Sequence, residues 1–204
     1  MKIITSIMVI SCMILLSLSA AACDTEPSQT TSTESTTTDN QSILTISGSW
    51  ASYYANMEEL SREADLIAYG EIDRVIEVQE QIVGHNPKGD MIHYYTNFNF
   101  KISQVLKGDG IEEAVIHQMG AAGKMVVPDD PMFKKGEEYV LFLHKTETGI
   151  YFVLGGPQGR FMVDGGKVFS MDNIIGDKVF LSDDLSYNGI ELDDFMGDIS
   201  KELK

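Results

Sequence analysis

Cysteine is nearly absent from the chain, which has two cysteines in 204 residues, Cys12 and Cys23. Cys12 lies in an apolar N-terminal run, so the part of the chain that follows Cys23 contains no thiol. A disulfide framework and a cysteine-ligated zinc site are therefore excluded there. Small exported domains often need disulfides, but a domain of about 160 residues can bury enough apolar surface without them.

Sequence motifs of the common enzyme classes are also missing. The chain has no G-x-S-x-G and no H-E-x-x-H. A phosphate-binding loop ending at Gly123 and Lys124 would require glycine where Gln118 stands and serine or threonine where Met125 stands. A dinucleotide fingerprint fails because Glu113 occupies its third glycine position. These absences predict no catalytic residues and no cofactor, and they favour a non-catalytic function.

Positive charge is scarce, since the chain has 15 basic and 31 acidic residues and a net charge of −16. This balance argues against nucleic acid and against anionic lipid headgroups as partners. The acidic pairs do not fit the spacing of a calcium loop. The histidines stand singly along turns and strands, so no metal site is predicted, although three of them could converge on a barrel: His85, His93, His117 and His144.

Residues 1–22 have the three-part pattern of a secretory signal peptide. Lys2 supplies a short charged region, residues 3–18 are uncharged and mostly apolar, and small residues follow from Ser19 to Ala22. A transmembrane anchor is the main alternative, because the whole run approaches the roughly 20 residues that span a bilayer.

Cys23 favours the signal peptide. The box Ala20-Ala21-Ala22-Cys23 resembles the end of bacterial lipoprotein signals, although Ala20 stands where leucine is more usual. The resemblance implies cleavage before Cys23 and attachment of membrane lipid, including palmitate, to this residue. Acylation of this kind anchors a protein stably. The expected location is the outer face of the cell membrane.

Residues 23–42 predict a disordered tether behind the lipidated cysteine. From Asp24 to Ser42, 11 of 19 residues are serine or threonine and none is aromatic. Such a segment cannot bury enough apolar area to offset the entropy of ordering. Tethers like this resemble those of Gram-positive lipoproteins. A single folded domain is expected over residues 43–204.

Alternating apolar and polar residues predict a set of antiparallel strands in this domain. The pattern is clearest over residues 92–106, where Phe98 and Phe100 share the apolar face and Asn97 and Asn99 share the polar face. Gly70 indicates a bulge or a close backbone contact. The other expected strands are 65–78, 112–119, the end of 133–145, 149–155, 160–165 and 167–170, with a turn cluster at 83–90.

Two helices are expected, one on each side of the strands. Residues 56–64 form a short helix that Asn56 can cap, with Glu59 three residues further on as in a capping box. Residues 190–204 form an amphipathic closing helix whose apolar face holds Ile190, Leu192, Phe195, Ile199 and Leu203. The elements together predict a mainly β fold, a small antiparallel barrel or sandwich.

Three blocks within residues 60–165 resemble netrin-like domains, including the tissue inhibitors of metalloproteinases: "EADLIAYGEI", "FNFKISQVLKG" and "FKKGEEYVLFL". They also resemble a group of bacterial surface lipoproteins. The resemblance implies an OB-like Greek-key β-barrel. It does not imply inhibition of metalloproteinases, because the only N-terminal cysteine is Cys23, more than 40 residues before Asp65.

The loop "GGPQGRF" (155–161) is the most distinctive surface candidate. Arg160, beside glycines, could present its guanidinium to a carboxylate or phosphate, and Gly156 and Gln158 would complete a ligand-binding site. The alternative is a hairpin turn in which Arg160 pairs with a neighbouring acid. Trp50, Tyr53 and Tyr54 similarly form either a peptide-binding strip or part of the packing against the barrel.

The leading functional hypothesis is a non-catalytic cell-surface lipoprotein whose barrel binds a protein, peptide or glycan of the envelope. One alternative is an envelope hydrolase with a serine and histidine site dispersed in the sequence. The other is a metal-binding accessory lipoprotein.

Replacing Cys23 tests the predicted lipid anchor. The Cys23→Ala variant is expected to incorporate no palmitate label and to leave the membrane fraction, because it lacks the thiol that accepts the lipid. A variant that stays membrane-bound, labelled and unchanged in mass would contradict the prediction.

Overall fold

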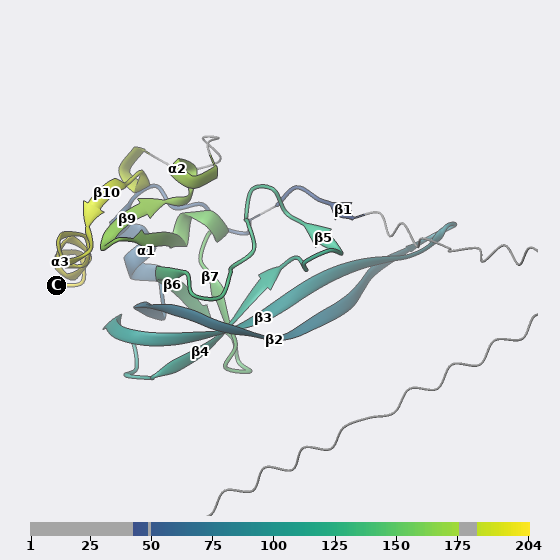
Figure 1. The fold of residues 1–204 in the computed structure, drawn as a ribbon, viewed down its shortest axis with the longest axis horizontal. Helices are drawn as coiled ribbons and strands as arrows, with labels where there is room; N and C mark the ends of the chain where they lie inside the picture. The colour runs from purple at the N-terminus through teal and green to yellow at the C-terminus, as the bar shows by residue number, and fades with distance from the viewer. Residues whose placement is uncertain (1–42, 49, 176–182) are drawn as a thin grey trace, which may run out of the picture. The chain divides into compact units, whose positions relative to one another are not determined.

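The computed structural model describes residues 43–48, 50–175 and 183–204. Cys12, Cys23, the predicted signal peptide (1–22) and the predicted tether (23–42) lie outside these residues. No helix among the described residues is long and apolar enough to span a membrane. The described part is mainly β and ends in a helix (Figure 1).

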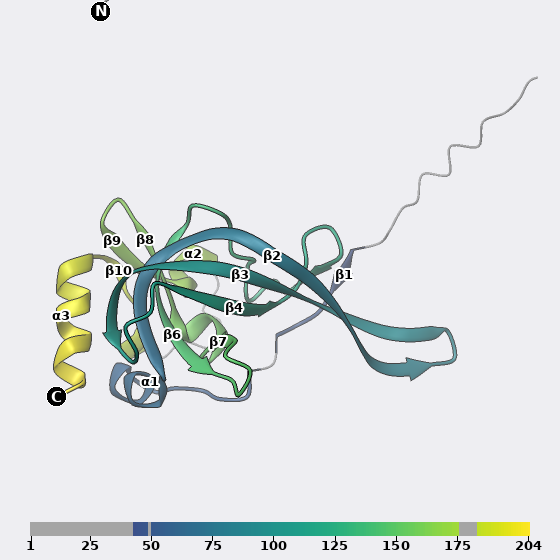
Figure 2. The same ribbon diagram turned by 90° about the horizontal axis from the view of Figure 1, so that it is seen from below.

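Eight strands form one mixed sheet in the order β10–β9–β8–β6–β2–β3–β4–β7 (Figure 2). Their bounds are β2 Leu66–Asn86, β3 Gly89–Lys107, β4 Glu113–Met119, β6 Glu138–Lys145, β7 Tyr151–Val153, β8 Arg160–Asp164, β9 Lys167–Ser170 and β10 Asn188–Glu191. Two short strands, β1 (Leu44–Thr45) and β5 (Met125–Val126), pair in a separate parallel sheet.

An additional pairing of β6 with β7 joins β2, β3, β4, β7 and β6 into a partial ring. Neighbouring strands in this ring are antiparallel except β4 and β7, which are parallel. The prediction of antiparallel strands throughout is therefore wrong for this pair. The reason is geometric, because five strands around a ring cannot all alternate in direction.

The hairpin of β2 and β3 is longer than the sequence predicts. Residues 83–86, expected in the turn cluster, belong to β2, and only residues 87 and 88 separate the strands. β6 pairs with β2 over Leu66–Glu71, and β4 pairs with β3 over Tyr95–Lys101. The distal part of the hairpin, residues 80–86 and 89–94, is therefore a two-stranded ribbon with no third strand beside it (Figure 2).

The polar face of β3 is only partly exposed to solvent, since Lys101 and Ser103 are exposed but the two asparagines are not. Asn97 and Asn99 are only 2% and 3% exposed. Asn97 donates from Nδ2 to Glu77 Oε1 at 2.8 Å, and Asn99 lies among charged side chains of the two flanking strands. Side chains of β2 and β4 cover both asparagines because β3 lies between these strands.

The core has two clusters of buried apolar side chains, and β6 separates them. Val140 and Phe142 point to the cluster shared with the helices, whereas Leu141 and Leu143 point to the cluster inside the partial ring. All four side chains are fully buried. Successive residues of a strand face opposite sides, so a run of apolar residues fits a strand that is covered on both faces.

Helix α1 (Met57–Glu63) confirms the expected N-terminal helix. The Asn56 side chain accepts a hydrogen bond from the Glu59 N–H at 2.9 Å, as predicted. The Glu59 carboxylate, however, accepts from the N–H of Ala55 at 3.0 Å, one residue before the position of a regular capping box.

Helix α3 (Leu192–Glu202) confirms the closing helix but begins later than expected, because Ile190 lies in β10. Phe195 and Ile199 of α3 pack fully buried into the first core cluster. Three short helical segments were not predicted: α2 (Met171–Ile175), η1 (Gly156–Gly159) and η2 (Asp183–Leu185).

Gly70 marks a close backbone approach, as the sequence predicts. The β2–β3 register shifts between Tyr69 and Gly70, and a Cβ at this position would overlap the backbone carbonyl oxygen of Lys101. The backbone on both sides is fixed in the sheet, so it cannot easily move away.

The Gly70→Ala variant is expected to lose about 2–3 kcal/mol of stability, through overpacking against backbone. Gly84→Ala is the matched control on the same strand, since its Cβ would meet only Met91 Sδ at 3.6 Å. Urea denaturation measures both free energies of unfolding. Equal stability of the two variants would contradict the assigned contact.

Candidate functional site

A cavity of about 340 Å³ lies where β3, β4, β6 and β7 meet the chain segment before α1 and the loop before η1. It is the candidate functional site. Its walls are formed by Trp50, Ala51, Ser52, Tyr54, Tyr95, His117, Gln118, Met119, Asp130, His144, Phe152, Val153, Leu154, Gly155 and Gly156. The volume is within the range of small-ligand sites.

Aromatic rings make up much of the cavity wall. The His117 ring stacks on Tyr95, with centroids 4.8 Å apart and ring planes 16° apart. Phe152 meets His117 nearly at a right angle, with centroids 4.9 Å apart and planes at 73°. Trp50 and Tyr54 belong to the same wall. The rings therefore form walls in different orientations and not one flat platform.

His117 is held by a chain of hydrogen bonds that runs across three strands. Its Nδ1 lies 2.6 Å from Asn97 Oδ1, and the Asn97 amide donates to Glu77. Because the Asn97 oxygen faces the ring, Nδ1 carries the proton, and Nε2 is the acceptor of the neutral imidazole. Burial lowers the pKa of His117, although Glu77 acts in the opposite direction. The ring is therefore uncharged at neutral pH.

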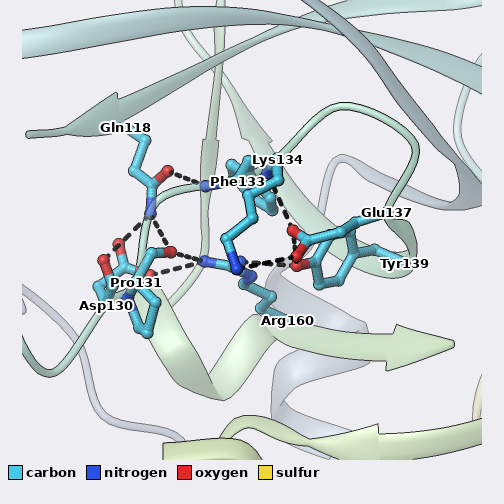
Figure 3. A network of polar contacts seen from close by, with 8 residues as sticks. All are labelled: Gln118, Asp130, Pro131, Phe133, Lys134, Glu137, Tyr139 and Arg160. Atoms are coloured by element: carbon cyan, nitrogen blue, oxygen red, sulfur yellow. Dashed lines mark hydrogen bonds and ion pairs between the residues drawn. The ribbon is translucent and has the colours of Figure 1, made fainter. Parts of the chain in front are cut away.

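Arg160 is buried and does not lie on the surface loop that the sequence predicts. Figure 3 shows its side chain between Asp130 and Tyr139. It is 2% exposed. Its Nη1 forms an ion pair with Asp130 Oδ1 at 3.1 Å and also donates to the carbonyl oxygen of Pro131. Its Nη2 donates to the Tyr139 hydroxyl at 2.7 Å. The predicted exposure of Arg160 is wrong, because these acceptors and two aromatic rings enclose the guanidinium.

The two rings are those of Phe133 and Tyr139, whose centroids lie 3.9 Å and 4.7 Å from Arg160 Cζ. The Tyr139 hydroxyl donates in turn to Glu137 Oε2 at 2.7 Å. Burial raises the pKa of Tyr139 to about 12, so the hydroxyl keeps its proton and can donate it to Glu137. A charged hydrogen-bonded chain thus leads from Asp130 to Glu137.

Gln118 ties the same loop to β4 (Figure 3). Its Nε2 donates to the carbonyl oxygens of Asp130 and Pro131, at 3.3 Å and 3.1 Å, and its Oε1 accepts from the N–H of Phe133 at 3.0 Å. Burial raises the pKa of Asp130, against the opposing effects of Arg160 and Gln118. Gln118 and Asp130 both line the cavity, so this network fixes one wall.

Gln158 fixes a second part of the wall, the segment that contains Tyr54. Its amide makes two hydrogen bonds to the backbone of Tyr54, accepting from the N–H and donating to the carbonyl oxygen, both at 2.9 Å. Gly156 has a φ of +57°, and a Cβ there would lie 2.5 Å from the Trp50 ring. The Trp50 indole therefore packs flat on a position that only glycine can occupy.

The three predicted ligand-binding residues thus lie close to the cavity but play different parts. Gly156 lines the cavity, whereas Gln158 and Arg160 are buried behind its walls. The segment that holds Gly156 and Gln158 is the helical turn η1 and not a hairpin, since β7 and β8 both pair with β6. The expected pairing of Arg160 with an acid is confirmed at Asp130. Ligand binding by these residues stays a prediction.

The four histidines lie in different surroundings, and His93 lies on the distal ribbon opposite Gln81. His117 and His144 both line the cavity. His144 Nδ1 pairs with Asp65 at 2.8 Å, and His85 pairs with Asp90 at 2.7 Å on the distal ribbon. Within the described residues, no group of three or more His, Cys, Asp or Glu side chains is placed to hold a metal ion.

Sequence reasoning did not identify the cavity, because its walls come from chain positions between 50 and 156. The sequence signal for the cavity was the group of aromatic residues Trp50, Tyr53 and Tyr54. Trp50 and Tyr54 line the cavity, whereas Tyr53 is 58% exposed and does not. No protein-family model matches this chain, and no curated protein matches it.

Replacing Arg160 tests the buried network. Arg160→Met is expected to lower the free energy of unfolding by about 3–5 kcal/mol, because it leaves the Asp130 carboxylate buried without its cation. Arg62→Met is the control, since Arg62 pairs with Glu63 at the surface and should change stability little. Chemical denaturation measures both.

The coupling between Arg160 and Asp130 is tested with the double variant Arg160→Met, Asp130→Asn. Its loss of stability is expected to be smaller than the sum of the two single losses, because the unpaired charge has gone. Additive losses would contradict a direct ion pair.

Proposed function

We propose that this chain is a non-catalytic lipoprotein of the cell surface, anchored through lipid on Cys23 to the outer face of a Gram-positive membrane, and that it binds a ligand of the envelope. The sequence pattern of residues 1–42 supports the anchor and the tether. The cavity between β4, β7 and the segment before α1 supports the binding function.

We also propose that the partial ring of β2, β3, β4, β7 and β6 is an OB-like Greek-key barrel. The pairing of β6 with β7 and the similarity of three sequence blocks to netrin-like domains support this finer description. In OB folds the barrel strands and the loops at one end form the usual binding surface. The cavity lies on strands β3, β4, β6 and β7 of the ring and on segments outside it.

One observation carries the binding function: the cavity is concave and largely apolar, and buried hydrogen bonds fix its walls. Gln118 and Gln158 each hold a wall segment through two or more hydrogen bonds to backbone atoms. A site whose walls are fixed before binding loses little conformational entropy when the ligand enters. This arrangement suits recognition of a ligand group.

A hydrolase is the second candidate, because Ser52 and His117 line the same cavity and Asn97 orients the histidine. No hydrogen bond among the described residues joins Ser52 to a histidine. A serine nucleophile needs a base within hydrogen-bond reach. The geometry therefore favours binding over hydrolysis.

The binding function is tested by incubating the purified full chain with solubilised envelope material and measuring the captured mass. Phe152→Ala is expected to reduce capture strongly, because its ring, 42% exposed, forms part of the cavity wall. Tyr53→Ala removes a ring of the same kind, 58% exposed, that does not line the cavity, and should bind like the wild type.

Equal capture by the two variants, or no capture by the wild type, would overturn the assignment of binding to the cavity. Loss of capture in Ser52→Ala with release of a cleaved product by the wild type would favour the hydrolase instead.

A further inference from the structure

The cavity wall offers no fixed positive charge. Its fifteen residues include neither lysine nor arginine. One carboxylate, that of Asp130, belongs to the wall, while its partner Arg160 does not. Two histidines also belong to the wall. Burial lowers the pKa of His117, and His144 pairs with Asp65. An anionic ligand group would therefore meet no lysine or arginine there.

Aromatic rings have electron-rich faces that attract cations. Trp50, Tyr54, Tyr95 and Phe152 all contribute to the wall. A cation within about 6 Å of a ring centroid is attracted to the face of the ring, most strongly when the cation is desolvated. A net charge of −16 on the chain also attracts cations to the protein.

Two acceptors of the wall are already engaged. Arg160 Nη1 pairs with Asp130 Oδ1, and the N–H of Phe133 donates to Gln118 Oε1. A primary ammonium group carries three N–H donors that each need an acceptor in a buried site, and the neutral His117 ring offers one at Nε2. A quaternary ammonium group has no N–H donor, and its methyl groups pack directly against aromatic rings.

We infer that the aromatic-walled cavity binds the quaternary ammonium group of its ligand. This inference rests on the proposed binding function and names the chemical class of the ligand. The trimethylammonium head contacts the faces of the aromatic rings, and the remaining volume and the polar side chain of Ser52 are available to the part of the ligand that carries the head.

The test uses choline chloride and its neutral carbon isostere, in which a tert-butyl group replaces the trimethylammonium group. The two have the same shape and differ in charge. The purified full chain is titrated with each, and binding is followed by the fluorescence of Trp50, the single tryptophan of the chain. Choline is expected to bind about tenfold more tightly than the isostere.

Phe152→Leu removes a ring but keeps an apolar side chain. It is expected to lower the affinity for choline severalfold and to leave that for the isostere nearly unchanged, whereas Tyr53→Leu should alter neither. Tetramethylammonium carries the quaternary ammonium group without the rest of either ligand, and it is expected to bind as well. Comparison of choline with trimethyl-lysine then distinguishes a choline-bearing ligand from a lysine-derived one.

Equal affinity for choline and its isostere, or no binding of choline, would overturn the inference. Either result leaves the proposed binding function to be decided by the capture experiment with Phe152→Ala and Tyr53→Ala. If choline binds but those two variants capture envelope material equally, the cavity has the inferred chemistry and the proposed function is wrong.

Discussion

Arg160 and Asp130 form an ion pair inside the protein, and the cavity depends on it. Asp130 belongs to a loop between β5 and β6 that makes no sheet pairing of its own. The guanidinium, together with Gln118, binds the carboxylate and two carbonyl oxygens of this loop. Buried side chains thus supply the hydrogen bonds that strand neighbours would otherwise provide. Without its partner, either charge would carry a large desolvation penalty, so the pair holds the loop in one position.

Gln158 does the same for the segment before α1, which also lines the cavity. Its amide pairs with both backbone groups of Tyr54, which places Trp50 against Gly156. The aromatic wall is therefore a consequence of two polar networks behind it. Strands β3, β4 and β7 add Tyr95, His117 and Phe152, whose positions the sheet register fixes. The result is a cavity whose wall contains several aromatic rings and the buried His117 but no lysine or arginine. The inferred preference for a cation rests on this composition.

The sequence was sufficient for most strands and both main helices, because their periodicity reports local burial. The apolar run of β6 and the capping of α1 by Asn56 could both be predicted, because each depends on residues that are close together in the sequence. Arg160 was placed wrongly at the surface, since glycines next to it in the chain indicate a turn and its partner Asp130 is 30 residues away. The burial of Asn97 had no local signal either, because it depends on Glu77 and His117 of neighbouring strands. Polar contacts between residues that are far apart in the sequence produce no periodic pattern in the sequence.

Amide hydrogen exchange of the full chain tests most directly whether buried side chains hold the cavity walls. The N–H groups of Tyr54 and Phe133 lie outside every strand and donate to the side-chain oxygens of Gln158 and Gln118. We expect both amides to exchange as slowly as amides of the central strand β6, and Gln158→Ala to accelerate exchange at Tyr54 much more than at Phe133. Fast exchange of both amides in the wild type, at the rate of an unstructured loop, would contradict this expectation.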